Sequence, residues 1–436
     1  SDVIGELNGV GRSDVHAHVR SLLDRLDTSG RYAFIKLATG GLRIGVSARL
    51  AKQALALMGD VDVAEIETLW HGLDVPYESL FAWLEGKGDK PELTTPAVFH
   101  SVMLAHPVAE SDLEKLDPAD YLAEWKWDGI RVQLSSDGAH RKLYSRSGDD
   151  ISGSFPDILE TVDFEGVLDG ELLIGGTART NSPTLTFSDL QQRLNRKTVT
   201  KKHMSDYPAF IRAYDLLFFK DRDIREAPLD DRRARLSDLV EKAARDRFDL
   251  SPLVEFDSWE DLDRLRKDPH DPVIEGVMMK RRDSAYQAGR VKGPWFKWKR
   301  EPHIIDAVMM YAQRGHGKRS SYYSDFTFGV WTGDPGAEML VPVGKAYFGF
   351  TDAELEILDR FVRNNTVERF GPVRAVRAEP ESGFVLEVAF EGIARSKRHK
   401  SGVAMRFPRI SRLRQDKLPA EADRLDTLTA MIDDRS

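Results

Sequence analysis

The sequence lacks cysteine altogether. This absence excludes disulfide bonds, thiolate zinc sites and cysteine nucleophiles, and it fits a protein of a reducing compartment. The chain also lacks any apolar run of about 18 or more residues. Its first ten residues contain no basic stretch leading into an apolar one, so no signal peptide is predicted. We therefore expect a cytoplasmic protein without a membrane partner.

An excess of positive charge is also missing, because the formal net charge is -8 at pH 7. Proteins that bind phosphate-rich partners normally show a basic excess, so the total charge argues mildly against nucleic acid. Two segments differ from this average. Residues 275–301 contain eight bases against three acids, and residues 391–417 contain nine bases against two acids. Such segments are either solvated faces or phosphate-binding surfaces, and charge alone leaves both open.

A chain of 436 residues predicts two or three domains. Apolar residues at helical spacing follow the capping candidates Ser13 and Asp14, and a second helix is predicted over 47–59, with Ser47 as N-cap and a buried stripe. That stripe contains Leu50, Ala54, Leu57 and Met58. The first hundred residues therefore predict a helical region. It ends in a polar linker over 86–95.

From about residue 104 the pattern changes to short strands. Strands are predicted at 130–134, before an Asp137-Gly138 turn, and at 167–174 and 209–219. Helical patterns lie between them, so we expect an α+β domain with an antiparallel sheet rather than a doubly wound one. No glycine-rich dinucleotide or P-loop motif follows a strand.

After residue 300 the sequence becomes mostly β. The predicted strands include segments near 304–311, 326–331, 340–343 and 384–390. One helix begins after Thr351, with Glu354 completing a capping box and Leu355 and Leu358 facing the core. Five short strands and one helix predict a small barrel of the OB type.

Chemistry is indicated by an ordered set of short motifs. The first is the tetrapeptide Lys126-Trp127-Asp128-Gly129, at a strand-to-turn transition where a lysine can project into a cleft. Each motif alone is weak, and a surface turn would explain it. The following segments are Ser145-Arg146-Ser147-Gly148, Leu168-Asp169-Gly170-Glu171, Ala213-Tyr214-Asp215-Leu216, Glu275-Gly276-Val277-Met278-Met279-Lys280, Trp295-Phe296-Lys297-Trp298-Lys299, Arg406-Phe407-Pro408-Arg409 and Arg414-Gln415-Asp416-Lys417.

In this order the segments resemble the covalent nucleotidyltransferase superfamily and, within it, the ATP-dependent DNA ligases of the larger type. The resemblance covers nearly the whole chain. It implies a multidomain protein with an all-α DNA-binding domain at 1–95, an α+β nucleotidyltransferase (ATP-grasp-like ligase) core at 104–300 and an all-β OB-fold domain at 301–436. The helical region before Gly40 is shorter than in the larger ligases, which indicates an N-terminal truncation. A hinge is expected at 299–303.

The resemblance also assigns roles to individual residues. Lys126 would be the nucleophile that forms a lysine-AMP intermediate with ATP. The basic C-terminal motif would orient the leaving pyrophosphate through Arg414 and Lys417. The remaining expected nucleotide contacts come from Glu124 and Tyr214 at the base, Glu171 at the ribose or a metal, Arg131, Arg146 and Arg290 beside the nucleotide, and Lys297 and Lys299 at the α-phosphate.

The acidic residues point to a metal. Glu171 and Glu275 lie on otherwise apolar strands, where an unpaired carboxylate would be costly to bury, so a metal or cationic partner is expected. Mg²⁺ (or Mn²⁺) suits oxygen ligands and phosphates. A lysine amine, with a reference pKa of about 10.4, becomes nucleophilic when nearby cations lower that value. We expect Lys297, Lys299 and the metal to do so.

The partner implied by the resemblance is nicked duplex DNA, sealed by a monomer in DNA repair, recombination or replication, and associated with the nucleoid in a bacterium. The segment 40–45 resembles a signature of the helical DNA-binding domain, which assigns DNA contacts to Gly41, Arg43 and Gly45. Three alternatives stay open or are disfavoured. They are RNA ligation or capping on the same scaffold, a noncatalytic nick-binding adaptor, and NAD-dependent ligation, which normally accompanies a cysteine zinc finger.

Overall fold

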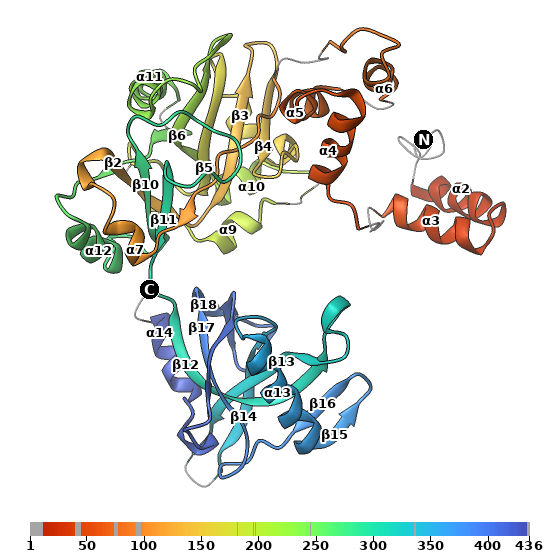
Figure 1. The fold of residues 1–436 in the computed structure, drawn as a ribbon, viewed down its shortest axis with the longest axis vertical. Coiled ribbons are helices and arrows are strands. Elements are labelled where there is room, and N and C mark those ends of the chain that lie inside the picture. The colour runs from red at the N-terminus through yellow and green to blue at the C-terminus, as the bar shows by residue number, and fades with distance from the viewer. Residues whose placement is uncertain are drawn as a thin grey trace. The chain divides into compact units, whose positions relative to one another are not determined.

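The computed structural model describes residues 12–39, 45–73, 77–92, 97–180, 182–194, 196, 198–244, 246–334 and 337–433. The chain divides into two compact units, Ser1–Lys299 and Arg300–Ser436 (Figure 1). This boundary falls inside the segment 299–303 predicted as a hinge. Within the described ranges, no helix is long and apolar enough to cross a membrane.

The helical region begins unit 1, and its helices are α2 (Arg12–Asp24), α3 (Thr28–Ala38), α4 (Ala48–Gly59), α5 (Val63–Gly72) and α6 (Glu78–Leu84). The predicted start of α4 is confirmed, since the Ser47 side chain accepts a hydrogen bond from the Leu50 amide at 3.2 Å. Its predicted buried stripe is wrong. Leu57 is 84% exposed, whereas Ala56 is buried. The small residues on the Ala56 side allow close approach, because a Cβ at Gly59 would overlap a Leu84 methyl.

The rest of unit 1 contains two sheets, and the pairings among its described strands are antiparallel apart from β1 with β11 and β6 with β8. The predicted preference for antiparallel pairing is therefore confirmed. One sheet has the order β4-β3-β5-β6-β7 with β8 beside β6, and the other the order β1-β11-β10-β2-β9. The strands are β1 (His106–Pro107), β2 (Tyr121–Trp127), β3 (Ile130–Ser136), β4 (Arg141–Ser145), β5 (Gly166–Ile174), β6 (Ala209–Phe219), β7 (Arg222–Asp223), β8 (Phe248–Leu250), β9 (Leu253–Val254), β10 (Ile274–Arg281) and β11 (Trp295–Lys299).

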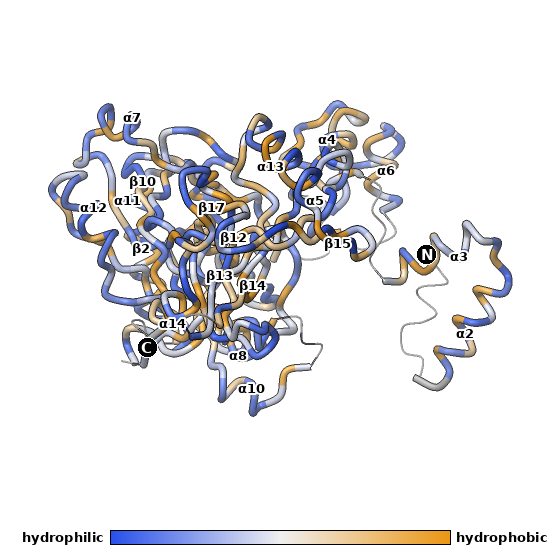
Figure 2. The backbone as a smooth tube through the Cα atoms, turned by 90° about the horizontal axis from the view of Figure 1, so that it is seen from below, coloured by the Kyte–Doolittle hydropathy of each residue, from blue (hydrophilic) through white to orange (hydrophobic). Residues whose placement is uncertain are grey.

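Short helices connect these strands, and Figure 2 colours α12 largely hydrophilic. Two apolar clusters hold the core together. The larger lies around Leu168, Ile211 and Phe248, and the smaller around Tyr121, Val277 and the helix residue Leu262. The helices are α7 (Glu110–Leu113), α8 (Pro156–Leu159), α9 (Phe187–Gln191), α10 (Lys201–Asp206), α11 (Leu229–Lys242) and α12 (Trp259–Lys267).

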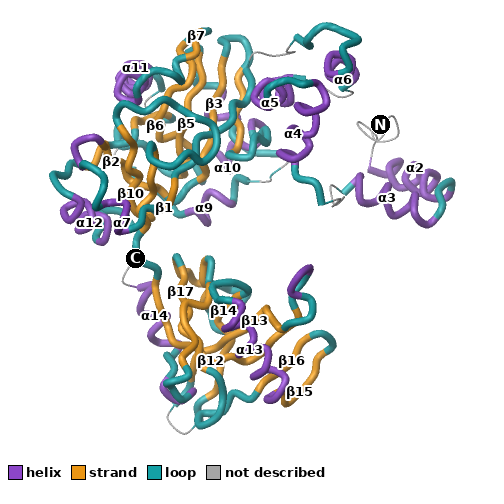
Figure 3. Tube along the Cα trace, in the orientation of Figure 1, coloured by secondary structure: helices purple, strands orange, loops and turns teal. Residues whose placement is uncertain are grey.

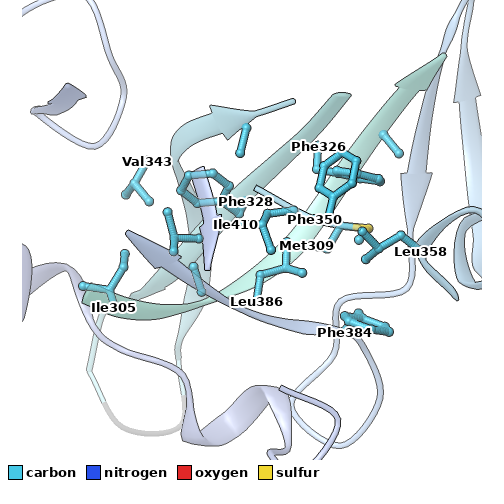
Figure 4. Packing of buried hydrophobic residues seen from close by; sticks show 14 of the residues in the cluster. Ile305, Met309, Phe326, Phe328, Val343, Phe350, Leu358, Phe384, Leu386 and Ile410 are labelled. Atoms are coloured by element: carbon cyan, nitrogen blue, oxygen red, sulfur yellow. The ribbon is translucent and has the colours of Figure 1, made fainter. Parts of the chain in front are cut away.

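Unit 2 is a curled β-sheet of OB type with helices α13 (Asp352–Asn365) and α14 (Leu425–Asp433) (Figure 3). Its core includes Phe326, Phe328, Met309, Leu358 and Ile410 (Figure 4). The strands are β12 (His303–Arg314), β13 (Tyr323–Thr332), β14 (Met339–Ala346), β15 (Thr366–Phe370), β16 (Val373–Val376), β17 (Val385–Phe390), β18 (Gly392–Arg395), β19 (Val403–Arg406) and β20 (Arg409–Arg414).

The predicted capping box of α13 is present, with reciprocal hydrogen bonds between Thr351 and Glu354. The predicted count of five strands and one helix is too small. A seven-stranded sheet and the separate β18–β19 hairpin replace it, and α14 is an additional helix. The extra strand β15 is mostly exposed and polar, so it carries no apolar alternation that would reveal it.

Candidate active site

The predicted nucleophile lies near the end of β2, where the chain turns into β3. The Asp128 amide donates a hydrogen bond to the Val273 carbonyl at 2.8 Å, which fixes this turn against the strand entering β10. Gly129 follows. A Cβ at that position would lie 2.5 Å from the Leu172 carbonyl oxygen and 2.9 Å from the Glu171 Cγ. The turn can therefore pass against β5 only because residue 129 has no side chain.

A carboxylate from β10 faces Lys126 directly. The register between β2 and β10 shifts between Ile274 and Gly276, and Gly276 has a φ of 149°. Such a bulge redirects the intervening side chain. The Glu275 carboxylate accepts a hydrogen bond from the Lys126 amine at 2.5 Å, and the Lys299 amine lies 3.7 Å away. The Glu275 carboxylate is thus a neighbour of two amines, those of Lys126 and Lys299.

Glu171 on β5 is a second acidic residue near Lys126 and Glu275. Burial raises the pKa of Glu171 to about 7, against the opposing effects of Lys126 and Arg131 and together with the neighbouring Glu275 and Asp128. Burial disfavours the charged form of this carboxylate, and the attraction of Lys126 and Arg131 offsets that effect only in part. The pair Glu171 and Glu275 would therefore gain from an additional cation.

The expected lowering of the Lys126 pKa is not found. Burial lowers the pKa of Lys126, but Glu275, Glu171 and Asp128 outweigh burial, and the pKa lies above its usual value. The Glu275 carboxylate lies 2.5 Å from the amine. The prediction relied on a metal at these carboxylates as well as on Lys297 and Lys299, so for the metal-bound site it stays a prediction.

Lys297, rather than Lys126, is the lysine whose pKa neighbouring cations lower. Burial lowers the pKa of Lys297, and repulsion from Arg290, Lys299, Lys126 and Arg146 lowers it further. These basic side chains come from separate segments of the sequence and act on one another. Such mutual repulsion is relieved when an anion binds between the cations. Arg146 and Arg290 are exposed, each in a loop beside this cluster.

A buried group of ions surrounds Glu124, which lies two residues before Lys126 on β2. The Glu124 carboxylate is 1% exposed and accepts hydrogen bonds from Arg233 and, at 2.7 Å, from the Lys280 amine. The Lys280 amine lies 4.3 Å from the centre of the Tyr214 ring and 4.6 Å from that of Trp295. Glu124 and Tyr214 thus lie beside the same lysine, Lys280, which ends the motif at 275–280 and received no role in the sequence analysis. Their contacts with the base stay a prediction.

Arg131 is held from several sides. Its guanidinium donates to the Met103 carbonyl at 2.5 Å, to Asp169 at 2.6 Å and to the Tyr286 hydroxyl at 3.0 Å. Its Nε is buried and has no hydrogen-bond partner among the residues that the structure describes. A buried donor without a partner costs free energy, so a ligand that accepts this hydrogen bond would be favoured. Sequence reasoning missed Asp169 and Tyr286, although Asp169 precedes the glycine of a recognised motif.

The two predicted pyrophosphate contacts lie in unit 2 and share one carboxylate. Arg414 donates to Asp306 at 3.0 and 3.2 Å, and the Lys417 amine donates to Asp306 at 2.6 Å. Arg414 also forms two hydrogen bonds with Asp416, at 2.8 and 3.0 Å. No motif in the sequence pointed to Asp306, which lies more than a hundred residues before both cations.

The predicted DNA contacts and the metal site are less well defined. Gly45 has a φ of 76°, and a Cβ at that position would have nothing within 4 Å, whereas Gly41 and Arg43 lie outside the described residues. In the described ranges, no group of three or more histidine or acidic side chains could hold a metal alone. A metal at Glu171 and Glu275 would need oxygen ligands from elsewhere.

Comparison with known proteins gives the class of the chain. Residues 102–299 match the model of the ATP dependent DNA ligase domain, and residues 319–417 match that of the ATP dependent DNA ligase C terminal region. A solved structure described as "Pmar-Lig_PreS3" shares the fold, with a TM-score of 0.54 and 17% identity over 95% of this chain and 98% of that one. The chain is a nucleotidyltransferase with a catalytic core and a C-terminal OB region.

Relatives specify the family. The probable DNA ligase of Koribacter versatilis is 35% identical, over 93% of this chain and 72% of that protein. The probable DNA ligase of Streptomyces avermitilis is 32% identical, over 98% of this chain and 82% of that protein. The DNA ligase of Thermococcus onnurineus is 27% identical, over 99% and 76%. The chain belongs to the ATP-dependent DNA ligase family, as its motifs predicted, and its enzyme class is DNA ligase (ATP).

Proposed function

We propose that Lys126 is the residue that becomes adenylylated. Its amine attacks the α-phosphorus of ATP, a P–N bond forms, and the bond to the pyrophosphate oxygen breaks. The proton lost by the amine passes to one of the facing carboxylates. The observation that carries this assignment is the meeting of Lys126 with Glu275 at 2.5 Å, beside the mutually repelling cations around Lys297. Phosphoryl-type transfer depends on such positioning and charge neutralisation.

Two further transfers complete the reaction on nicked duplex DNA. The 5′-phosphate at the nick attacks the phosphorus of the lysine-bound AMP, which releases the Lys126 amine. The 3′-hydroxyl then attacks the activated 5′-phosphate, a phosphodiester bond forms, and AMP leaves. We propose that one monomer performs the three steps, with a rotation at 299–303 between them, and that Gly41, Arg43 and Gly45 contact the duplex.

The nucleotide pocket follows from the same geometry. Tyr214, beside Lys280 and Glu124, would stack on the base. Arg131, whose Nε has no hydrogen-bond partner in the described part of the chain, and Arg146 would hold the nucleotide. Lys297 and Lys299 would contact the α-phosphate, and Arg290 would add positive charge beside them. Arg414 and Lys417 would orient the leaving pyrophosphate.

The carboxylates fit a magnesium ion. Mg²⁺ is usually held by one or two carboxylates together with water and substrate phosphates. Glu171 and Glu275 supply that donor set. Burial raises the pKa of Glu171 to about 7 by disfavouring its charged form, which a bound cation would stabilise. Bound there, Mg²⁺ or Mn²⁺ would neutralise charge on the α-phosphate. If Glu171 does not hold the metal, it would contact the ribose.

A sealing assay tests this function against its alternatives. The full chain is incubated with Mg²⁺ and a duplex that carries a labelled 5′-phosphate at a nick, with ATP, GTP or NAD. Sealing with ATP alone, abolished in Lys126→Arg, is the expected result. Sealing with GTP or NAD, or of a nicked RNA duplex in preference to DNA, would contradict the assignment. Tight binding of nicked DNA without sealing in the presence of ATP would indicate an adaptor instead.

A further inference from the structure

Asp306 is a buried acid on β12 that none of the roles above uses. It is 9% exposed. Its carboxylate accepts hydrogen bonds from Lys417 at 2.6 Å and from Arg414 at 3.0 and 3.2 Å. A buried carboxylate that joins two cations of one short motif constrains both side chains at once.

The backbone beneath this carboxylate is fixed as well. The Asp306 amide donates to the Asp423 carboxylate at 2.7 Å, and the Asp423 amide donates back to the Asp306 carbonyl at 2.8 Å. Asp306 also lies opposite Glu387 in the antiparallel pair of β12 and β17. The carboxylate therefore stands on a strand in the interior of the seven-stranded sheet rather than on a loop.

The two cations differ in how much freedom they retain. Arg414 is held from a second side by Asp416, at 2.8 and 3.0 Å. Among the described residues, Asp306 is the one acid that pairs with Lys417. A lysine amine on a flexible stem has three donors, so two remain for a phosphate when one is used by Asp306. Without that contact the Lys417 stem would sample several rotamers.

We propose that Asp306 is a positioning residue for the first nucleotidyl transfer, which places Lys417 and Arg414 side by side so that they receive the pyrophosphate as a pair. The proposal rests on the proposed role of these two cations. It assigns Asp306 no contact with the substrate. Because pyrophosphate leaves only in the first step, Asp306 should matter for self-adenylylation and not for the closure of a nick that is already adenylylated.

The experiment measures two separate steps on the full-length chain. Self-adenylylation is followed with α-labelled ATP and Mg²⁺, and closure is followed on a nicked duplex that carries a 5′-adenylyl group, without ATP. The variant is Asp306→Asn, which keeps the shape and removes the charge. Glu387→Gln is the matched control, because it removes a carboxylate 3.8 Å from Arg414 that does not contact Lys417.

In Asp306→Asn, the rate of self-adenylylation should fall by about ten-fold or more, as expected for displaced charge-stabilising groups, while closure stays within about two-fold. Glu387→Gln should leave both rates close to wild type. If Asp306→Asn does not fold, Asp306→Glu, which retains the charge at a shifted position, should still lower self-adenylylation selectively. Thermal unfolding of each variant checks its folding.

Four results would contradict the proposal. Equal losses in both steps would make Asp306 a structural residue of unit 2. Faster self-adenylylation in Asp306→Asn would mean that the carboxylate competes with pyrophosphate for the cations. Unchanged rates in Asp306→Asn, together with slow self-adenylylation in Arg414→Ala, would refute the positioning role alone. Normal self-adenylylation in the double variant Arg414→Ala, Lys417→Ala would refute the proposed role of the cations and this proposal with it.

Discussion

The glycine of the Lys126-Trp127-Asp128-Gly129 motif offers a stringent test of the site geometry. In Gly129→Ala, the new methyl would lie 2.5 Å from the Leu172 carbonyl oxygen, 2.8 Å from a Leu173 methyl and 2.9 Å from the Glu171 Cγ. Cβ contacts below 3.0 Å essentially never occur in real proteins, so the turn or β5 must move. The nearest atom belongs to the backbone of a buried strand, which cannot rotate away as a side chain does.

The size of the effect follows from these contacts. Forcing a methyl into a packed site costs about 1–3 kcal/mol. Replacing glycine by alanine also restricts the unfolded chain, which offsets about 0.4–1 kcal/mol. We expect a net destabilisation of about 1–2 kcal/mol, a change of about five- to thirty-fold in the unfolding equilibrium. Because Glu171 is one of the displaced groups, covalent adenylylation should also fall by about ten-fold or more.

Urea unfolding monitored by tryptophan fluorescence measures the stability, and covalent labelling with α-labelled ATP measures the activity. Gly153→Ala is the matched control, because its new methyl would have no described atom within 4 Å apart from those of its chain neighbours. That variant should be neutral or slightly more stable, with normal labelling. A Gly129→Ala protein with the urea midpoint and labelling of Gly153→Ala would refute the close approach of the turn to β5.

Three further results are expected. Arg193 is fully buried and donates to Asp157 at 2.5 Å and to the Ser154 and Tyr207 carbonyls. The substitution Arg193→Met should lower the unfolding free energy, measured in urea, by about 3–5 kcal/mol, because it leaves Asp157 unpaired. Burial lowers the pKa of both His71 and His100 from 6.5 to about 4. Between these values the unfolded chain binds more protons than the folded chain, so the unfolding free energy should fall as the pH drops from 6.5 towards 4. An unfolding free energy that stays constant in urea titrations over this pH range would contradict the prediction. Glu275→Gln should raise the Mg²⁺ concentration needed for half-maximal labelling, and an unchanged requirement would exclude Glu275 as a metal ligand.

Local sequence signals located most of the secondary structure near the site. The apolar run at 209–219 coincides with β6, and the capping box at Thr351 gives the start of α13. Both features depend on neighbours in the sequence. The buried face of α4 was predicted wrongly because Leu57 and Ala56 both fit a helical repeat, and contact with α6 decides which side is covered.

The motifs located the site, but not the balance of charge within it. Lys280 pairs with Glu124 from 156 positions away, and Asp306 reaches Lys417 across 111 positions. Pairs at such distances leave no periodic trace in one sequence. The two lysines named in the sequence do not by themselves lower the pKa of Lys126, because Glu275, Glu171 and Asp128 raise it. The lowering expected with a metal stays a prediction.

Covalent labelling of the denatured polypeptide tests the central assignment most directly. The full chain and its Lys126→Ala variant are incubated with α-labelled ATP and Mg²⁺, then denatured, and the adenylylated position is located by mass spectrometry of peptides. We predict label on Lys126 in the wild type and none in the variant. A folded, AMP-free wild type that takes up no label, or a Lys126→Ala variant that retains it, would contradict the account.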